Sequence, residues 1–141
     1  MLDNFYLELL DDTVYLYSFD ISYKKSILAS LLPILLNDKF FSMTQSEKEF
    51  SLFISSKLTD VISELNNYSD FLIRINRVID EYSVLRIYQD THNINEHGIV
   101  FRLSKIFYEK NIPILYVNSY SNNYVLIPST AIKELDEWIE Y

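Results

Sequence analysis

The spacing of apolar residues predicts alternating strands and helices in the C-terminal half of the chain. Residues 82–89 carry many β-branched and aromatic side chains, which are typical of a strand. A helix is predicted next, because apolar residues recur at intervals of three and four on one face: Ile99, Val100, Leu103, Ile106 and Phe107. Strands at 114–117 and 124–127 follow, and Ser129 or Thr130 can cap a last helix. This half therefore reads β-α-β-β-α.

The N-terminal half begins with a similar order. The β-branched and aromatic stretch 13–19 predicts a strand, and Asp11 and Asp12 before it predict a turn. The apolar stretch 26–36 is compatible with a helix if Ser30 caps it and Pro33 lies in its first turn.

A hairpin and more helix are predicted after that stretch. Strand-like runs at 40–44 and 50–55 are separated by a polar connection of hairpin length. Leu58, Val61, Ile62 and Leu65 then have helical spacing, and a second set with the same period follows Ser69 and Asp70: Phe71, Leu72, Ile75, Val78 and Ile79. Two helices, or one bent helix, are therefore expected over 58–81.

These elements predict an α+β fold made of two consecutive units. Alternation of this kind builds antiparallel sheets with helices on one face, and the ferredoxin-like β-α-β-β-α-β arrangement accounts for the order in both halves. We expect an N-terminal unit at 1–81, with a helical elaboration at about 58–81, and a C-terminal unit at 82–141.

Composition excludes several classes of function. Twelve Lys and Arg against twenty Asp and Glu give a net charge of −8, which repels phosphate backbones and argues against a nucleic-acid partner. There is no cysteine, so disulfides, thiolate metal sites and thiol nucleophiles are excluded, as is typical of a reducing, cytoplasmic setting. The longest apolar run, 27–36, is too short for a membrane span, and the acidic N-terminus does not resemble a signal peptide.

No pattern in the sequence indicates catalysis, a cofactor or a metal. A single glycine cannot form a phosphate-binding loop, and there is no G-x-S-x-G elbow. His92 and His97 are five positions apart, which places them on different helix faces, so we expect no metal site. The twelve tyrosines and nine phenylalanines either fill an aromatic-rich core or contribute to an oligomer interface.

Two blocks resemble ACT-domain proteins related to the CASTOR arginine sensors. The stretch F-F-S-M-T-Q-S-E-K-E-F-S-L at 40–52 is similar to the family pattern F-F-S-x-T-x-T-x-x-E-x-S-h. Gly98-Ile99-Val100 followed by 112–127 resembles the family's G-h-h and its G-I-S-h-h-h-h-S-T-a-x-T-D-a-h-L-V. With the strand 82–89 between them, these blocks cover about half of the chain and imply two tandem ACT-like units.

The resemblance implies a regulatory protein that is not an enzyme, needs no cofactor and couples an amino-acid ligand to a protein partner or a homodimer. The ligand residues that it implies are His97, Gly98, Ile99, Asn118, Ser119, Tyr120, Asn122 and Asn123. The family's Thr-Asp is replaced by Asn122-Asn123, which removes a charge-assisted hydrogen bond of about 1.5–3 kcal/mol and argues against arginine as the ligand.

Each of these residues also has a purely structural interpretation. Gly98 lies where a polar loop enters a helix, so it can present backbone N–H groups to an anion such as an α-carboxylate, or it can simply serve a tight turn. Asn118, Ser119 and Asn123 can bind an amino-acid backbone, or they can favour a polar hairpin turn. An ACT-fold interaction module that binds no ligand is therefore the alternative to a sensor.

Overall fold

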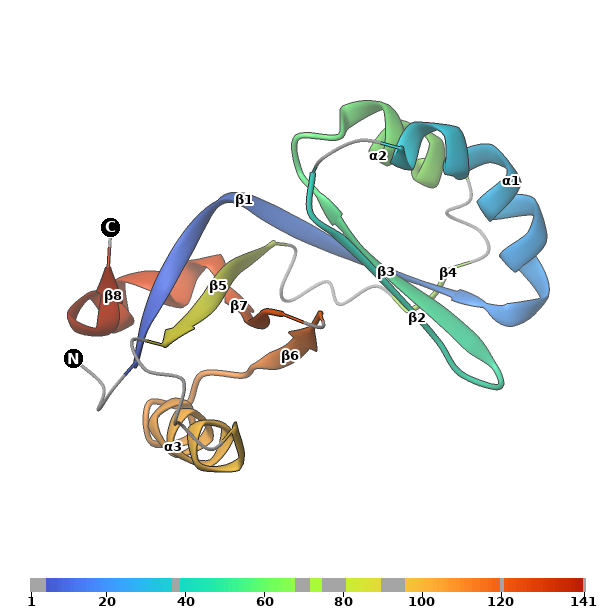
Figure 1. Ribbon diagram of the computed structural model, residues 1–141. Coiled ribbons are helices and arrows are strands. Elements are labelled where there is room, and N and C mark those ends of the chain that lie inside the picture. Colours follow the sequence, from blue (N-terminus) through green and yellow to red (C-terminus); the bar gives the residue numbers. More distant parts are fainter. Residues whose placement is uncertain are drawn as a thin grey trace. The chain divides into compact units, whose positions relative to one another are not determined.

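The structure is a computed structural model that describes residues 5–36, 39–67, 72–74, 81–89, 96–119 and 121–140 (Figure 1). The chain divides into two compact units. One contains residues 12–81, and we call it unit A; the other combines residues 1–11 with 82–141, and we call it unit B. The sequence placed residues 1–11 with the N-terminal unit, whereas in the structure residues 5–11 belong to unit B. The reason is that the first strand, β1 (Phe5–Asp20), runs through both units.

Unit A has the order β-α-β-β-α-β. Residues 12–20 of β1 lead into a short 3₁₀-helix η1 (Ile21–Tyr23) and α1 (Lys24–Leu35), and the hairpin β2 (Phe41–Gln45) and β3 (Glu49–Ser55) follows. Helix α2 (Thr59–Asn66) and strand β4 (Leu72–Arg74) complete the unit. Every strand pairing is antiparallel, and the spatial order is β4-β1-β3-β2. This is the ferredoxin-like arrangement.

The core of unit A lies between one sheet face and both helices. Tyr17 and Phe19 on β1 are paired with Leu52 and Phe50 on β3, so these four side chains share a face. The Phe19 and Phe50 rings stack with centroids 5.4 Å apart. Helices α1 and α2 cover this face with buried aliphatic residues: Ile27, Leu31, Val61 and Leu65. Helices therefore pack on one face of the sheet, as the pattern predicted.

Unit B repeats this order with one change at its last strand. It contains β5 (Tyr82–Gln89), α3 (Glu96–Glu109), β6 (Leu115–Asn118), β7 (Asn123–Pro128), the 3₁₀-helix η3 (Ser129–Trp138) and β8 (Ile139–Glu140). Strands β6, β7 and β5 are antiparallel neighbours, and β5 also pairs with β1. Strand β8 pairs in parallel with β1 through Leu7 and Ile139. In a simple β-α-β-β-α-β unit the last strand pairs with the free edge of the first strand, which here is β5. In unit B residues 5–11 of β1 occupy that edge, and the last strand, β8, pairs with β1 instead.

The C-terminal cap of helix α3 directs the chain that follows it into the core of unit B. Asn111 has φ 57°, in the left-handed region, and its N–H donates to the Tyr108 carbonyl. The Ile112 N–H donates to the Phe107 carbonyl, which completes a Schellman motif. Ile112 and Phe107 are both buried in the same core, so this cap directs the chain into the sheet toward β6. Lys110 lies 4.6 Å from the centroid of the Trp138 ring.

Four local expectations are corrected by the structure. Asp11 and Asp12 lie inside β1 and make no turn. Helix α1 begins at Lys24, before Ser30, so Ser30 does not cap it and Pro33 lies near its end. The predicted second helix at 71–79 is a strand at Leu72–Arg74, because these residues pair with the edge of β1, and the other part of that prediction lies outside the described residues. The last helix is a 3₁₀-helix without a side-chain cap.

Candidate functional site

The two units carry a hairpin turn with the same hydrogen bonds. In unit A the Ser46 N–H donates to the Glu49 carbonyl at 2.8 Å, and the Glu49 N–H donates to the Ser46 hydroxyl at 3.3 Å. In unit B the Ser119 N–H donates to the Asn122 carbonyl at 2.8 Å, and the Asn122 N–H donates to the Ser119 hydroxyl at 3.2 Å. Each serine stabilises its turn through side chain and backbone together. The β2–β3 and β6–β7 turns are therefore corresponding positions in the two units.

In unit A this turn borders a hollow of about 850 Å³, which is within the size range of small-molecule pockets. Its lining residues are Asp20, at the end of β1, and Ser46, Glu47, Lys48 and Glu49, in the turn and at the start of β3. Asp20 is brought to the turn because it is paired with Glu49, and because the Ile21 N–H donates to the Lys48 carbonyl at 2.8 Å. Three carboxylates and one ammonium give the hollow a net negative charge.

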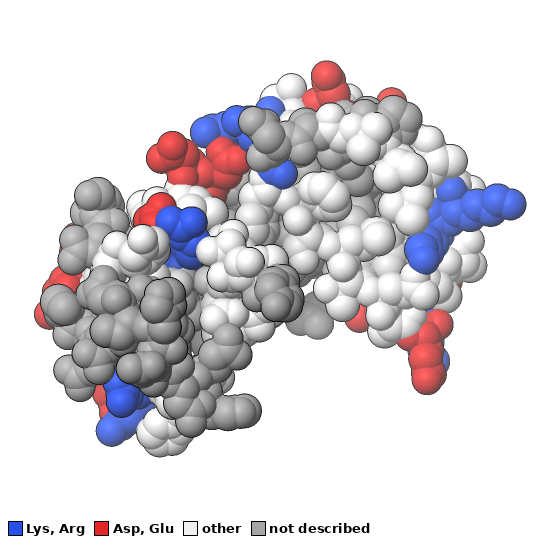
Figure 2. Space-filling view, viewed as in Figure 1, with Lys and Arg blue, Asp and Glu red and all other residues white. Residues whose placement is uncertain are grey.

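Hydrogen bonds hold two of these carboxylates in place. Asp20 accepts from the Ser22 hydroxyl at 2.6 Å and from the Ser22 N–H at 2.9 Å, and these bonds lower the pKa of the Asp20 carboxyl. Glu49 accepts from the Ser18 hydroxyl at 2.8 Å. In Figure 2 a small group of acidic side-chain atoms is visible at the end of unit A that carries this turn. The hollow is thus suited to a group with positive charge, such as an ammonium.

In unit B the structure brings together four of the residues that the sequence singled out. Asn118 is paired with Asn123 at the end of the β6–β7 ladder, and Ser119 and Asn122 close the turn between them. Asn118 and Ser119 are exposed, and Asn122 and Asn123 are half-buried. The Ser119 hydroxyl stabilises the turn, as the structural interpretation of this segment expected. Tyr120 lies outside the described residues.

The other three predicted residues lie in the first turn of α3. The backbone of His97, Gly98 and Ile99 is helical from Glu96 onward. Gly98 does not have a positive φ, and a Cβ added to it would meet no atom within 4 Å. Neither a tight turn nor crowding by the protein requires glycine here.

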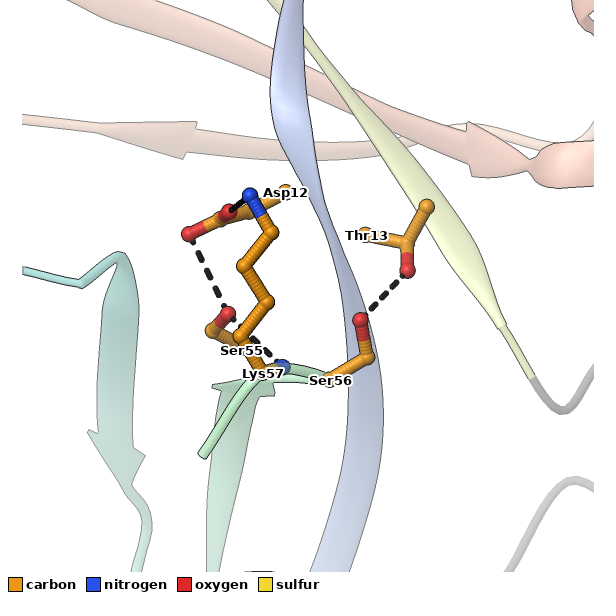
Figure 3. Close-up of polar contacts among 5 residues, drawn as sticks. All are labelled: Asp12, Thr13, Ser55, Ser56 and Lys57. Atoms are coloured by element: carbon orange, nitrogen blue, oxygen red, sulfur yellow. Dashed lines mark hydrogen bonds and ion pairs between the residues drawn. The ribbon is translucent and has the colours of Figure 1, made fainter. Parts of the chain in front are cut away.

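A second polar cluster in unit A joins β1 to the end of β3 (Figure 3). The Lys57 ammonium lies 2.7 Å from one Asp12 oxygen, and the Ser55 hydroxyl donates to the other at 3.1 Å. The Thr13 and Ser56 hydroxyls lie 2.8 Å apart. Burial raises the pKa of the Asp12 carboxyl, but the bonds from Lys57 and Ser55 and the Lys57 charge lower it below its usual value. Each of these side chains bonds at least one other member of the cluster, so the cluster stabilises the strand ends.

The described part of the chain contains no group of three His, Cys, Asp or Glu side chains placed to hold a metal ion. Within the same residues, no helix is long and apolar enough to cross a membrane.

Sequence reasoning missed the hollow of unit A, although it treated 45–48 as the connection of a hairpin. Two features of the sequence point to this turn. The segment lies within the block that resembles the family pattern, and a serine occupies the same place in both turns, three positions before the residue it bonds. What the sequence could not supply was the pairing that brings Asp20 beside Glu49.

Comparison with known proteins identifies the fold. Residues 77–134 match the family model of the ACT domain. A search of curated protein sequences found no significant match. Many solved structures are similar to the chain, at sequence identities that show a likeness of fold.

Three of these structures cover nearly the whole chain. A protein from Agrobacterium tumefaciens has 13% identity and a TM-score of 0.64, over 98% of this chain and 95% of its own. A Vibrio cholerae protein of unknown function has 9% identity and a TM-score of 0.63, over 96% and 90%. The regulatory subunit of aspartate kinase from Thermus flavus has 8% identity and a TM-score of 0.63, over 91% and 90%. The chain thus has a mixed α/β ACT fold with mainly antiparallel strand pairing.

Proposed function

We propose that the protein is a non-catalytic regulatory protein of two tandem ACT-like units that binds an amino acid or a similar small metabolite and couples its binding to a protein partner. In this proposal it works as a CASTOR-like sensor in the cytoplasm. The observation that carries the proposal is the corresponding pair of serine-stabilised hairpin turns, one of which borders a charged hollow. The fold shared with a regulatory subunit of aspartate kinase supports it.

The charges of the described residues indicate which ligand group each turn favours. In unit A the hollow offers the carboxylates of Asp20, Glu47 and Glu49, which attract an ammonium group. In unit B the first turn of α3 at Gly98 offers N–H groups and the positive end of the helix dipole, which attract a carboxylate. An amino acid carries an ammonium and a carboxylate, so each unit, taken by itself, offers a partner for one of these groups. The amides of Asn118, Asn122 and Asn123 add neutral donors and acceptors in unit B.

A thermal screen tests whether such a ligand exists. The thermal midpoint is measured with each of the twenty amino acids and close analogues at millimolar concentration. A ligand at about 100 times its Kd adds about 2.7 kcal/mol of stability, which corresponds to a rise of several degrees for a chain of this length. Coupling to a partner requires that the ligand binds one arrangement of the protein better than another.

Matched variants then locate the site. If the ligand binds unit A, Asp20→Asn should reduce the shift; if it binds unit B, Asn123→Ala should reduce it. Glu109→Gln, on the exposed side of α3, should not change the shift in either case. For a ligand of unit B, Gly98→Ala should also reduce the shift without lowering the midpoint of the free protein, because the structure has room for the added methyl group. A shift that survives all three site variants would place the ligand elsewhere.

The second candidate is an ACT-fold interaction module with no ligand. The observation that favours it is that the Ser119 and Asn122 groups in unit B already bond each other within the turn. If no metabolite changes the thermal midpoint, this second function replaces the sensor. Charge substitutions along a sheet edge should then disrupt binding to the partner.

A further inference from the structure

The outer side of helix α3 carries exposed aromatic residues, although the solvent side of a helix is normally polar. The helix lies against the sheet of unit B (Figure 1), and Leu103 and Phe107 on its inner side are buried in the core. Phe101 and Tyr108 are 69% and 82% exposed. They are seven positions apart, so they share one face of the helix. Aromatic side chains of this kind are enriched in the buried centre of protein interfaces.

The charges between these aromatic residues are positive, although the chain as a whole is acidic. Residues 98–108 contain two charged side chains, Arg102 and Lys105, and both are exposed. Lys105 is four positions from one aromatic residue and three from the other, so it lies between them on the helix surface. Glu96 and Glu109 lie at the two ends of the helix. The middle of this face therefore carries local positive charge in a chain with a net charge of −8.

Gly98 lies on the same side of the helix, one turn before Phe101. It is three positions before Phe101 and seven before Lys105. Glycine lowers the stability of a helix relative to alanine, and the fold gains nothing from it here, because φ is not positive and a Cβ would meet no atom within 4 Å. The space over Gly98 is open. A glycine in such a position lets the backbone of another molecule approach the helix closely.

We propose that this side of α3 is a docking surface for an acidic, apolar segment of another protein. We call its members the α3 face: Gly98, Phe101, Arg102, Lys105 and Tyr108. Apolar residues of the segment pack on the two aromatic rings, and its carboxylates pair with the two cations. Its backbone approaches the helix over Gly98. The inference rests on the proposed function only for the existence of a protein partner, since it requires no metabolite.

Charge favours this occupant over two others, a second copy of the chain and an anionic lipid surface. Either of those is large enough to meet the field of the whole chain, whose net charge is −8 and repels it. A short segment meets mainly the charges within about 10 Å, which is the screening length at 0.1 M salt. On the α3 face those charges are positive, so a short acidic segment is attracted.

A displayed peptide library tests the chemistry of the segment. Its members are amphipathic helical peptides of about 16 residues, in which Glu, Lys and Gln are equally frequent at the polar positions. With the full chain as bait, we expect Glu to be enriched over Lys among the peptides that bind. A selected peptide with a fluorescent label should then bind the chain more weakly as the salt concentration rises, because salt screens charge pairs at an exposed surface.

Variants of the chain locate the bound peptide. Lys105→Glu should raise the Kd of the selected peptide about tenfold. Lys133→Glu makes the same change of charge at an exposed residue of η3 and should leave the Kd unchanged. Phe101→Ser should weaken binding by removing an exposed ring, and Gly98→Leu should weaken it more than Gly98→Ala, because leucine fills more of the open space. Circular dichroism confirms that each variant folds.

Several results would overturn the proposal. These are a library that yields no binder, binders enriched in Lys, or a Kd unchanged by both Lys105→Glu and Phe101→Ser. Self-association of the chain in sedimentation, or binding to vesicles that contain phosphatidylserine, would also overturn it if Phe101→Ser abolished that association. None of these experiments contains a metabolite, so the docking surface can fail while the thermal screen succeeds, and the reverse.

Discussion

At the scale of single residues, Asp12 shows how one carboxylate joins the two strands at the end of unit A. Its side chain is only 14% exposed, and it bonds both the Lys57 ammonium and the Ser55 hydroxyl. Lys57 is half exposed, so solvent screens the pair, and its contribution to the free energy of unfolding is about 1 kcal/mol.

We expect Asp12→Asn to lower the free energy of unfolding by about this amount at neutral pH. Because the folded-state pKa of Asp12 lies below 3.8, the contribution is present above pH 3.8 and is lost as the pH falls through the lower folded value. Urea unfolding at pH 7 and at pH 3 measures both effects, with Asp11→Asn as the control. An Asp12→Asn loss that is as large at pH 3 as at pH 7 would exclude the ion pair as its cause.

At the scale of elements, the end of α3 depends on one residue with an unusual backbone angle. Asn111 adopts φ 57°, which glycine tolerates best, asparagine tolerates moderately and alanine tolerates poorly. We expect Asn111→Gly to keep or raise the thermal midpoint and Asn111→Ala to lower the free energy of unfolding by about 1 kcal/mol. Thermal unfolding of both variants checks the order, and an alanine variant more stable than the glycine variant would contradict it.

Elements with a clear period were predictable from the sequence. The structure contains the predicted strand at 82–89 and the predicted hairpin around 46–48. It also contains the two predicted helices, one with Val61 and one with Leu103. These elements were predictable because the period of each matches a buried face. The strand at Leu72–Arg74 was not predictable, since a short apolar run is compatible with a helix or a strand and only the open edge of β1 decides between them.

For the candidate site, sequence reasoning identified the turn around Ser119 but not the hollow beside Ser46. The first could be predicted because Asn and Ser favour turns on local grounds. The second depends on Asp20 reaching Glu49 across a strand pair, and the chain separates these residues by an entire helix and strand. Long-range pairings of this kind leave no local periodic signal.

At the scale of the whole molecule, each unit has its own core, and β1 contributes to both. Residues 5–11 pair with β5 and β8, whose core includes Phe107, whereas Phe19 is buried with Phe50 in unit A. A defect in one core should therefore affect only one part of this strand.

We expect Phe107→Ala to cost about 3–5 kcal/mol and to lower the hydrogen-exchange protection of residues 5–11 more than that of residues 12–20. Hydrogen exchange followed by mass spectrometry of overlapping peptides can compare the two halves of β1. Tyr108→Ala, at the exposed neighbouring position, is the control. Equal loss of protection along the whole strand would contradict the division of β1 between the units.

The divided strand also has a consequence for synthesis on the ribosome. Residues 5–11 emerge long before Ile139, with which Leu7 pairs. The strands of unit A have all emerged once residue 74 has left the ribosome, so unit A can fold early. At that stage residues 5–11 of β1 still lack β5 and β8, with which they pair. Unit B can close only after Ile139 has emerged. Nascent chains of this protein should therefore expose an unpaired strand until Ile139 has emerged, which is the period in which a chaperone would bind it.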